Sequence, residues 1–150
     1  MCMILIRHIL EDAQRQLVVL SREASASEVA EILTNPNIPV VVVCDSEGVA
    51  VGVISRTDIL KAFVRARSDA PNLKAEAIMT EAFLSCHVDQ TLQSVWASLN
   101  AQSVRCAPVL DDSRKPQGVV HARDLARAFV DELEGEEELL RDYVLGIGYQ

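Results

Sequence analysis

The sequence of 150 residues aligns with itself without a gap when it is shifted by 66 positions. Between residues 24–64 and residues 90–130, ten positions carry the same amino acid. The identical pairs are Val29/Val95, Leu33/Leu99, Val43/Val109, Asp45/Asp111, Gly52/Gly118, Val53/Val119, Asp58/Asp124, Ala62/Ala128, Phe63/Phe129 and Val64/Val130. Self-similarity at a fixed period is typical of a duplicated structural unit. We therefore expect two copies of one small unit.

Each copy contains the same order of expected elements. Apolar residues at Ala26, Val29 and Leu33 have the spacing of one helix face, and the pattern recurs 66 residues later. Two strands follow in each copy, at residues 40–44 and 49–55 and at residues 106–110 and 117–121. A second helix begins near Asp58 in the first copy and near Asp124 in the second. Short extended segments, residues 17–20 and 83–88, precede the copies and complete a three-stranded sheet in each.

A small sheet with two helices on one face leaves its other face bare, and a second copy can cover that face. We therefore predict an α/β (α+β) fold in which two repeats pack as a pseudo-two-fold pair. Residues 1–70 form the first repeat with its lead-in, residues 71–134 form the second, and residues 135–150 form an acidic C-terminal tail. Residues 68–80 are expected to be a surface connection, and Gly135 is expected to interrupt the last helix.

Charge and composition exclude several classes of partner. The chain has 14 basic and 22 acidic residues, a net charge of −8, which argues against a nucleic acid or an anionic membrane. The longest apolar run, residues 38–44, is too short to cross a bilayer, and the N-terminus does not resemble a signal peptide. The four cysteines form no CxxC pair and are not expected to form disulfides or a metal site, so we expect a reduced, cytoplasmic protein.

One heptapeptide in each repeat carries a resemblance to a known family. Residues 52–58 read GVISRTD and residues 118–124 read GVVHARD, at the junction between the last strand and the last helix of each repeat. They resemble the signature of CBS domains, and the sequences AIMT at 77–80 and APVLD at 107–111 are similar to two further features of that family. The tandem arrangement resembles a CBS pair, or Bateman module. The resemblance implies two clefts between the repeats that bind adenine nucleotides.

For the first cleft, the resemblance assigns phosphate binding to Ser55 and ribose binding to Asp58. The remaining candidates are motif neighbours, adenine walls and a basic phosphate ligand: Val53, Ile54, Arg56, Thr57, Phe83, Leu84 and Arg105. The residues alone leave alternatives open. Ser55 and Asp58 also have the spacing of a helix-capping box that needs no ligand, and Arg105 can be an ordinary exposed base.

The second cleft departs from the family pattern, because His121 stands where the hydroxyl residue is expected. Asp124 would bind the ribose, while His121 and Arg123 could donate to phosphate. The adenine walls would be Val119, Val120, Leu17 and Val18. Because the histidine also removes a capping hydroxyl, capping alone explains this motif poorly.

These observations predict a non-enzymatic regulatory module. It would bind an adenine nucleotide (AMP, ADP, ATP or NAD(H)) or an S-adenosyl compound and signal to a separate regulated protein, whose identity the sequence does not disclose. A homodimer is expected through an apolar stripe on the second helices of the repeats. The alternative is a ligand-free scaffold whose role is dimerisation. No Walker, HExxH or GxSxG motif is present, so no catalytic residue and no catalytic cofactor are predicted.

Overall fold

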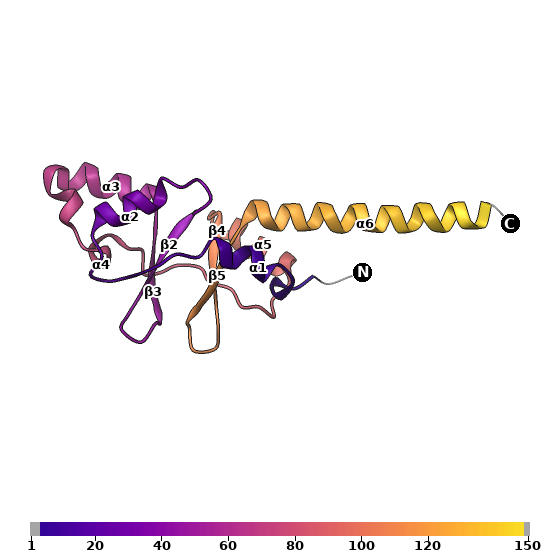
Figure 1. Cartoon of the computed structure of the whole chain (residues 1–150), viewed down its shortest axis with the longest axis horizontal. Helices are drawn as coiled ribbons and strands as arrows, with labels where there is room; N and C mark the ends of the chain where they lie inside the picture. The colour runs from indigo at the N-terminus through magenta and orange to yellow at the C-terminus, as the bar shows by residue number, and fades with distance from the viewer. Residues whose placement is uncertain (1–3, 149–150) are drawn as a thin grey trace.

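The computed structural model describes residues 4–148 and contains the predicted duplication (Figure 1). The first repeat and its lead-in comprise η1 (Ile6–Ile9), α1 (Leu10–Arg15), β1 (Val19–Ser21), α2 (Ala26–Leu33), β2 (Val40–Cys44), β3 (Ala50–Ser55) and α3 (Arg56–Ala66). The second comprises η2 (Arg67–Asn72), α4 (Ala75–Ile78), α5 (Leu92–Ala101), β4 (Cys106–Leu110), β5 (Pro116–His121) and α6 (Ala122–Gly148). The predicted order of helix, two strands and helix is confirmed in both repeats.

The sheet of the first repeat has three strands in the order β1-β2-β3. Strand β1 is parallel to β2, and β3 is antiparallel to β2, with Val42 opposite Val53. All five residues of β2 are buried, because its alternate side chains enter two different cores. Val41 and Val43 pack with α2 in the core of the first repeat, whereas Val40 and Val42 face the second repeat.

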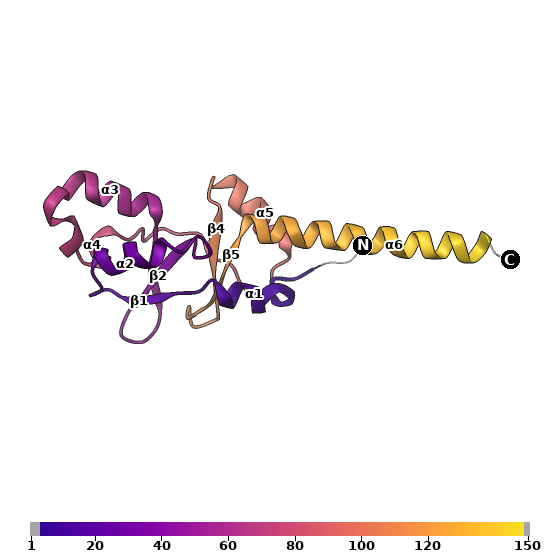
Figure 2. The same ribbon diagram turned by 45° about the horizontal axis from the view of Figure 1, so that its top comes forward.

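That second core joins the two repeats, as the bare face of the sheet predicted. It contains Val40, Val42, Cys44 and Ala50 from the first repeat and Leu110 and Val119 from the second. Between the two hairpins, the backbone N–H of Ala50 donates to the carbonyl of Arg114 at 3.0 Å. Packing of the two sheets against each other therefore fixes the relative position of the repeats (Figures 1 and 2).

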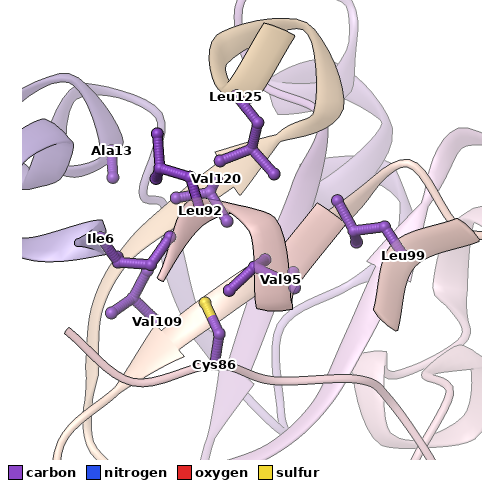
Figure 3. Packing of buried hydrophobic residues seen from close by; sticks show 10 residues of the cluster. Ile6, Ala13, Cys86, Leu92, Val95, Leu99, Val109, Val120 and Leu125 are labelled. Carbon is purple, nitrogen blue, oxygen red and sulfur yellow. The ribbon is translucent and has the colours of Figure 1, made fainter. Parts of the chain in front are cut away.

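The second repeat differs from the prediction at its lead-in segment. Its sheet has only two named strands, β4 and β5, because residues 83–88 pair with β4 through a single bridge between Cys86 and Val109. A turn that follows at once ends the pairing, with the N–H of Gln90 donating to the carbonyl of His87. Cys86 nevertheless lies in a well-packed core with Leu92, Val95, Val109 and Leu125 (Figure 3).

Two further expectations about the connections are wrong. Residues 68–80 are not a simple surface connection, because they form η2 and α4 and bury Ala70 and Ala75 completely. Gly135 does not interrupt the last helix, since α6 continues without a break to Gly148 and extends away from the body (Figure 2). The proposed boundary between residues 134 and 135 thus falls inside one helix, and a separate tail stays a prediction.

The two lead-in helices cross to opposite repeats. Helix α1 precedes the first repeat but packs on β5 of the second, with Ala13 in contact with Gly118. Helix α4 precedes the second repeat, and the residue that ends it, Met79, is in contact with Gly52 of β3 in the first. Ala13 and Met79 are themselves 66 residues apart, so the exchange obeys the same repeat as the sequence.

Candidate functional site

The junction between β3 and α3 places Ser55 and Asp58 as predicted. Ser55 caps α3: its Oγ accepts a hydrogen bond from the N–H of Asp58 at 3.3 Å, and its own N–H donates to Asp58 Oδ2 at 2.9 Å. The capping box expected from the spacing is therefore formed. The Thr80 hydroxyl faces both carboxylate oxygens of Asp58 at 3.4 Å, longer than the usual hydrogen bond from a hydroxyl of about 2.5–3.0 Å.

This junction lines a cavity of about 690 Å³ between the two repeats. The first repeat contributes Val53, Ser55, Thr57 and Asp58 to its wall, and Lys61 lies one helical turn further along α3. A cavity of this size falls within the range of small-molecule sites, roughly 300–1,000 Å³. Its floor and walls combine apolar surface with hydroxyl, carboxylate and ammonium groups.

The opposite wall of the cavity belongs to the second repeat. Phe83, Leu84, Arg105 and His121 all line it, together with Ala82. The structure therefore brings together residues that the sequence analysis had assigned to the first cleft, and it adds His121, which had been assigned to the second. Cavity residues that the sequence analysis missed are Pro39, Val40, Lys61, Thr80, Ala82, Gln102, Ser103, Val104, Cys106 and Pro108.

Two predicted site residues have structural roles. Ile54 is completely buried in the core of the first repeat and does not line the cavity, so its assignment as an adenine wall is wrong. Its strand neighbour Val53 points to the opposite face and does line the cavity. Arg56 reaches the cavity edge, but its guanidinium donates to the carbonyls of Leu33, Asn35 and Ile38 at 2.8–3.0 Å. That guanidinium secures the end of α2.

His121 and Cys106, which line the cavity from the second repeat, have pKa values that their surroundings shift. Burial lowers the pKa of His121, and the adjacent Arg123 lowers it further, so the imidazole favours its neutral form. Burial raises the pKa of the Cys106 thiol to about 11, which keeps the sulfur protonated. The Cys106 thiol therefore lacks the environment of an activated nucleophile. Within the described residues, no cluster of His, Cys, Asp or Glu is arranged to hold a metal ion.

The second predicted cleft is organised differently. Asp124 occupies the position of Asp58 and accepts a hydrogen bond from the N–H of His121 at 3.2 Å. His121 Nδ1 accepts from the N–H of Arg123 at 3.1 Å, so the histidine keeps a capping function that the sequence analysis had denied it. Asp124 Oδ2 also accepts a hydrogen bond from Gln16 Nε2 at 2.7 Å, much shorter than the 3.4 Å contact of Asp58 with Thr80.

The predicted adenine walls of this cleft belong to three different cores. Val119 and Leu17 belong to the core between the repeats, Val120 to the core of the second repeat, and Val18 packs against the core of the first. None of these residues, nor Asp124 or Arg123, lines the 690 Å³ cavity. The structure therefore brings most residues of the first candidate site together in this cavity and places most of those of the second outside it.

Comparisons with known proteins agree with this architecture. The model of the CBS domain family matches residues 6–65 and 75–131. L-aspartate semialdehyde sulfurtransferase of Methanocaldococcus jannaschii is 34% identical over 106 residues, which are 70% of this chain but only 20% of that relative. A 17.7 kDa protein of Acidianus ambivalens is 29% identical over 119 residues, 79% of this chain and 71% of that protein.

Solved structures give the same result. The CBS domain pair of protein MJ0100, in complex with 5′-methylthioadenosine and S-adenosyl-L-methionine, has a TM-score of 0.75 and 27% identity, covering 87% of this chain and 99% of that one. A CBS-domain containing protein from Agrobacterium tumefaciens shares the fold, with a TM-score of 0.72 and 23% identity over 83% of this chain and 92% of that one. With both repeats matched by the family model, this chain belongs to the CBS domain family and contains a tandem CBS pair.

Proposed function

We propose that this CBS pair is a non-enzymatic sensor that binds one adenosyl ligand in the 690 Å³ cavity and thereby regulates another protein. The observation that carries the proposal is the convergence of both repeats on that cavity, with Ser55 and Asp58 on one side and Phe83 and Arg105 on the other. A ligand that touches both repeats favours one relative arrangement of them, which is what a sensor requires.

The chemistry of the cavity wall suits an adenosyl group. The carboxylate of Asp58 can accept hydrogen bonds from the two hydroxyls of a ribose, and Thr80 is its one polar neighbour from outside its own motif among the described residues. Val53 and Phe83 offer apolar surface for an adenine ring. Arg105 and Lys61 supply positive charge for a phosphate, or for the carboxylate of an S-adenosyl amino acid.

The candidate ligands are AMP, ADP, ATP, NAD(H) and S-adenosyl compounds. The complex of the MJ0100 pair with S-adenosyl-L-methionine and 5′-methylthioadenosine supports the adenosyl class. Because Arg56 is committed to backbone carbonyls, a phosphate chain would be bound by Arg105 and Lys61. S-Adenosylmethionine and 5′-methylthioadenosine are therefore the first compounds to titrate, followed by the nucleotides.

A homodimer is part of the proposal. Leu60, Val64 and Val130 on α3 and α6 are 66%, 76% and 51% exposed, which is unusual for large apolar side chains. Covering these helix faces with a second copy would remove that surface from water. Sedimentation velocity of the wild type and of Leu60→Ser/Val64→Ser should distinguish dimer from monomer.

No helix in residues 4–148 is long and apolar enough to cross a membrane.

Thermal melting in the presence of each candidate ligand tests the proposal. A ligand at 100 times its Kd stabilises the folded state by about 2.7 kcal/mol. At roughly 2–4 °C per kcal/mol for a chain of this size, the expected shift is about 5–10 °C. Asp58→Ala should abolish the shift. Asp124→Ala is the matched control, since it removes the equivalent helix-capping carboxylate outside the cavity and should keep the shift. Failure of every ligand to shift the wild type would favour the ligand-free scaffold.

A further inference from the structure

The two clefts of this chain differ in the lead-in residues that approach the acidic side chain. The shift of 66 residues pairs Gln16 with Ala82. Ala82 and Asp58 both line the open cavity, and the contact of this lead-in segment with the carboxylate is the long 3.4 Å hydrogen bond from the Thr80 hydroxyl. Gln16 instead lies against Asp124, with its amide nitrogen 2.7 Å from Asp124 Oδ2.

Gln16 also replaces a backbone contact of the first repeat. There, the carbonyl of Val53 accepts a hydrogen bond from the N–H of Thr80 at 2.8 Å. In the second repeat, the equivalent carbonyl of Val119 accepts from Gln16 Nε2 at 3.3 Å. One side-chain amide therefore satisfies both the strand carbonyl and the carboxylate at the place where a ligand would otherwise bind.

The closure leaves one polar atom unsatisfied. Gln16 Oε1 is buried and has no hydrogen-bond partner among the residues that the structure describes. A buried acceptor without a donor destabilises the state that buries it. The opposite orientation of the amide would place this oxygen against the carboxylate of Asp124, so the nitrogen is the atom that must face the acid. The amide is thus held through its nitrogen alone.

We propose that the Asp124 cleft is a second adenosyl site that Gln16 keeps closed, so that the chain binds one ligand where its duplicated fold provides for two. The inference rests on the proposed function for the class of ligand. Both lead-in segments contact the equivalent glycine, although Met79 meets Gly52 with its side chain and Ala13 meets Gly118 with backbone atoms and its Cβ. Within α1 and the residue that ends it, Gln16 is the residue whose side chain binds Asp124.

Isothermal titration calorimetry with 5′-methylthioadenosine and S-adenosylmethionine tests this inference through a pair of reciprocal variants. Gln16→Ala should bind one more equivalent per chain than the wild type, and Gln16→Ala/Asp124→Ala should lose that equivalent again. Ala82→Gln places the closing residue in the open cleft and should abolish binding at the Asp58 site. Because Ala82 is exposed, this variant should fold as the wild type does.

The outcomes separate this inference from the proposed function. If the wild type binds neither probe nor any of the candidate nucleotides but Gln16→Ala binds one equivalent, the proposed function fails and the closure by Gln16 stands. If the wild type binds one equivalent through Asp58 and Gln16→Ala binds no more, the proposed function stands and the closure is overturned. Equal stoichiometry in a folded Gln16→Ala, checked by its unfolding transition, overturns the inference in every case.

Discussion

Gly118 carries the most specific stability prediction, because it lies where α1 crosses strand β5. A Cβ atom at this position would lie 2.8 Å from the carbonyl carbon of Ala13, 2.9 Å from its Cβ and 3.0 Å from its carbonyl oxygen. Two of these three atoms are backbone, so no side-chain rotation relieves the overlap. Gly118→Ala therefore requires the whole of α1 to move away from β5.

The expected cost follows from two opposing effects. Overpacking of a tight contact destabilises by about 1–3 kcal/mol. Replacing glycine by alanine restricts the unfolded chain, which offsets about 0.4–1 kcal/mol of that cost. Gly118→Ala should therefore lower the free energy of unfolding by about 0.5–2 kcal/mol, and the Tm by about 1–8 °C at 2–4 °C per kcal/mol.

Gly52→Ala is the matched control in the other repeat. The three atoms nearest to its added Cβ would be Sδ, Cγ and Cβ of Met79, at 2.5, 2.7 and 2.9 Å. Rotation of the unbranched methionine side chain relieves the overlaps with Sδ and Cγ, and only the contact with Cβ is fixed by the backbone. Gly52→Ala should lower the free energy of unfolding less than Gly118→Ala does. Urea denaturation monitored by circular dichroism measures both changes, and the m-values should stay the same. A Gly118→Ala protein as stable as the wild type, or less affected than Gly52→Ala, would refute the reasoning from backbone contact.

Three further predictions concern other groups. Arg56→Met should lower the free energy of unfolding by about 1–3 kcal/mol in urea titrations, since it leaves carbonyls after α2 without their donor. The pKa of His121 is lower in the folded chain than its unfolded value of about 6.5, so the free energy of unfolding should fall as the pH drops below about 6.5. In urea titrations between pH 7.5 and 5.5, His121→Asn should lose less stability than the wild type. Burial raises the pKa of Cys86 to about 12 and that of Cys106 to about 11, so iodoacetamide at pH 7.5 should alkylate both thiols slowly. Peptide mass spectrometry measures the labelling, and rapid labelling of the native protein would contradict the packing.

The fold was predictable from the sequence because the repeat and the apolar spacing describe the same units. The helix faces at Val29 and Val95 and the strands around Val43 and Val109 are local patterns, and each is visible without knowledge of distant contacts. The third strand of the second repeat was harder to predict. Its pairing at Cys86 depends on where the following turn begins, which the apolar pattern does not specify.

The candidate site was predictable only in part. Ser55 and Asp58 were found because a short motif fixes both their spacing and their place at a helix start. Ile54 was misassigned although a signal existed, since adjacent residues of a strand point to opposite faces and Val53 had already been placed at the site. The commitment of Arg56 to carbonyls of another element is a tertiary contact, and no local pattern indicates it.

The duplicated aspartates explain why the motif alone cannot count the sites. Asp58 and Asp124 each accept a hydrogen bond from the backbone N–H of the residue three positions earlier, so both stabilise a helix start whether or not a ligand binds. The presence of aspartate at both positions is therefore explained by the fold, without a ligand. The clefts differ in the contact that the exchanged lead-in segment makes with each carboxylate. The Thr80 hydroxyl lies 3.4 Å from Asp58, which still lines the cavity, whereas the Gln16 amide binds Asp124 at 2.7 Å. In a repeat protein of this kind, the positions that decide ligand stoichiometry are those at which the copies differ, and the lead-in segments are where they should be sought first.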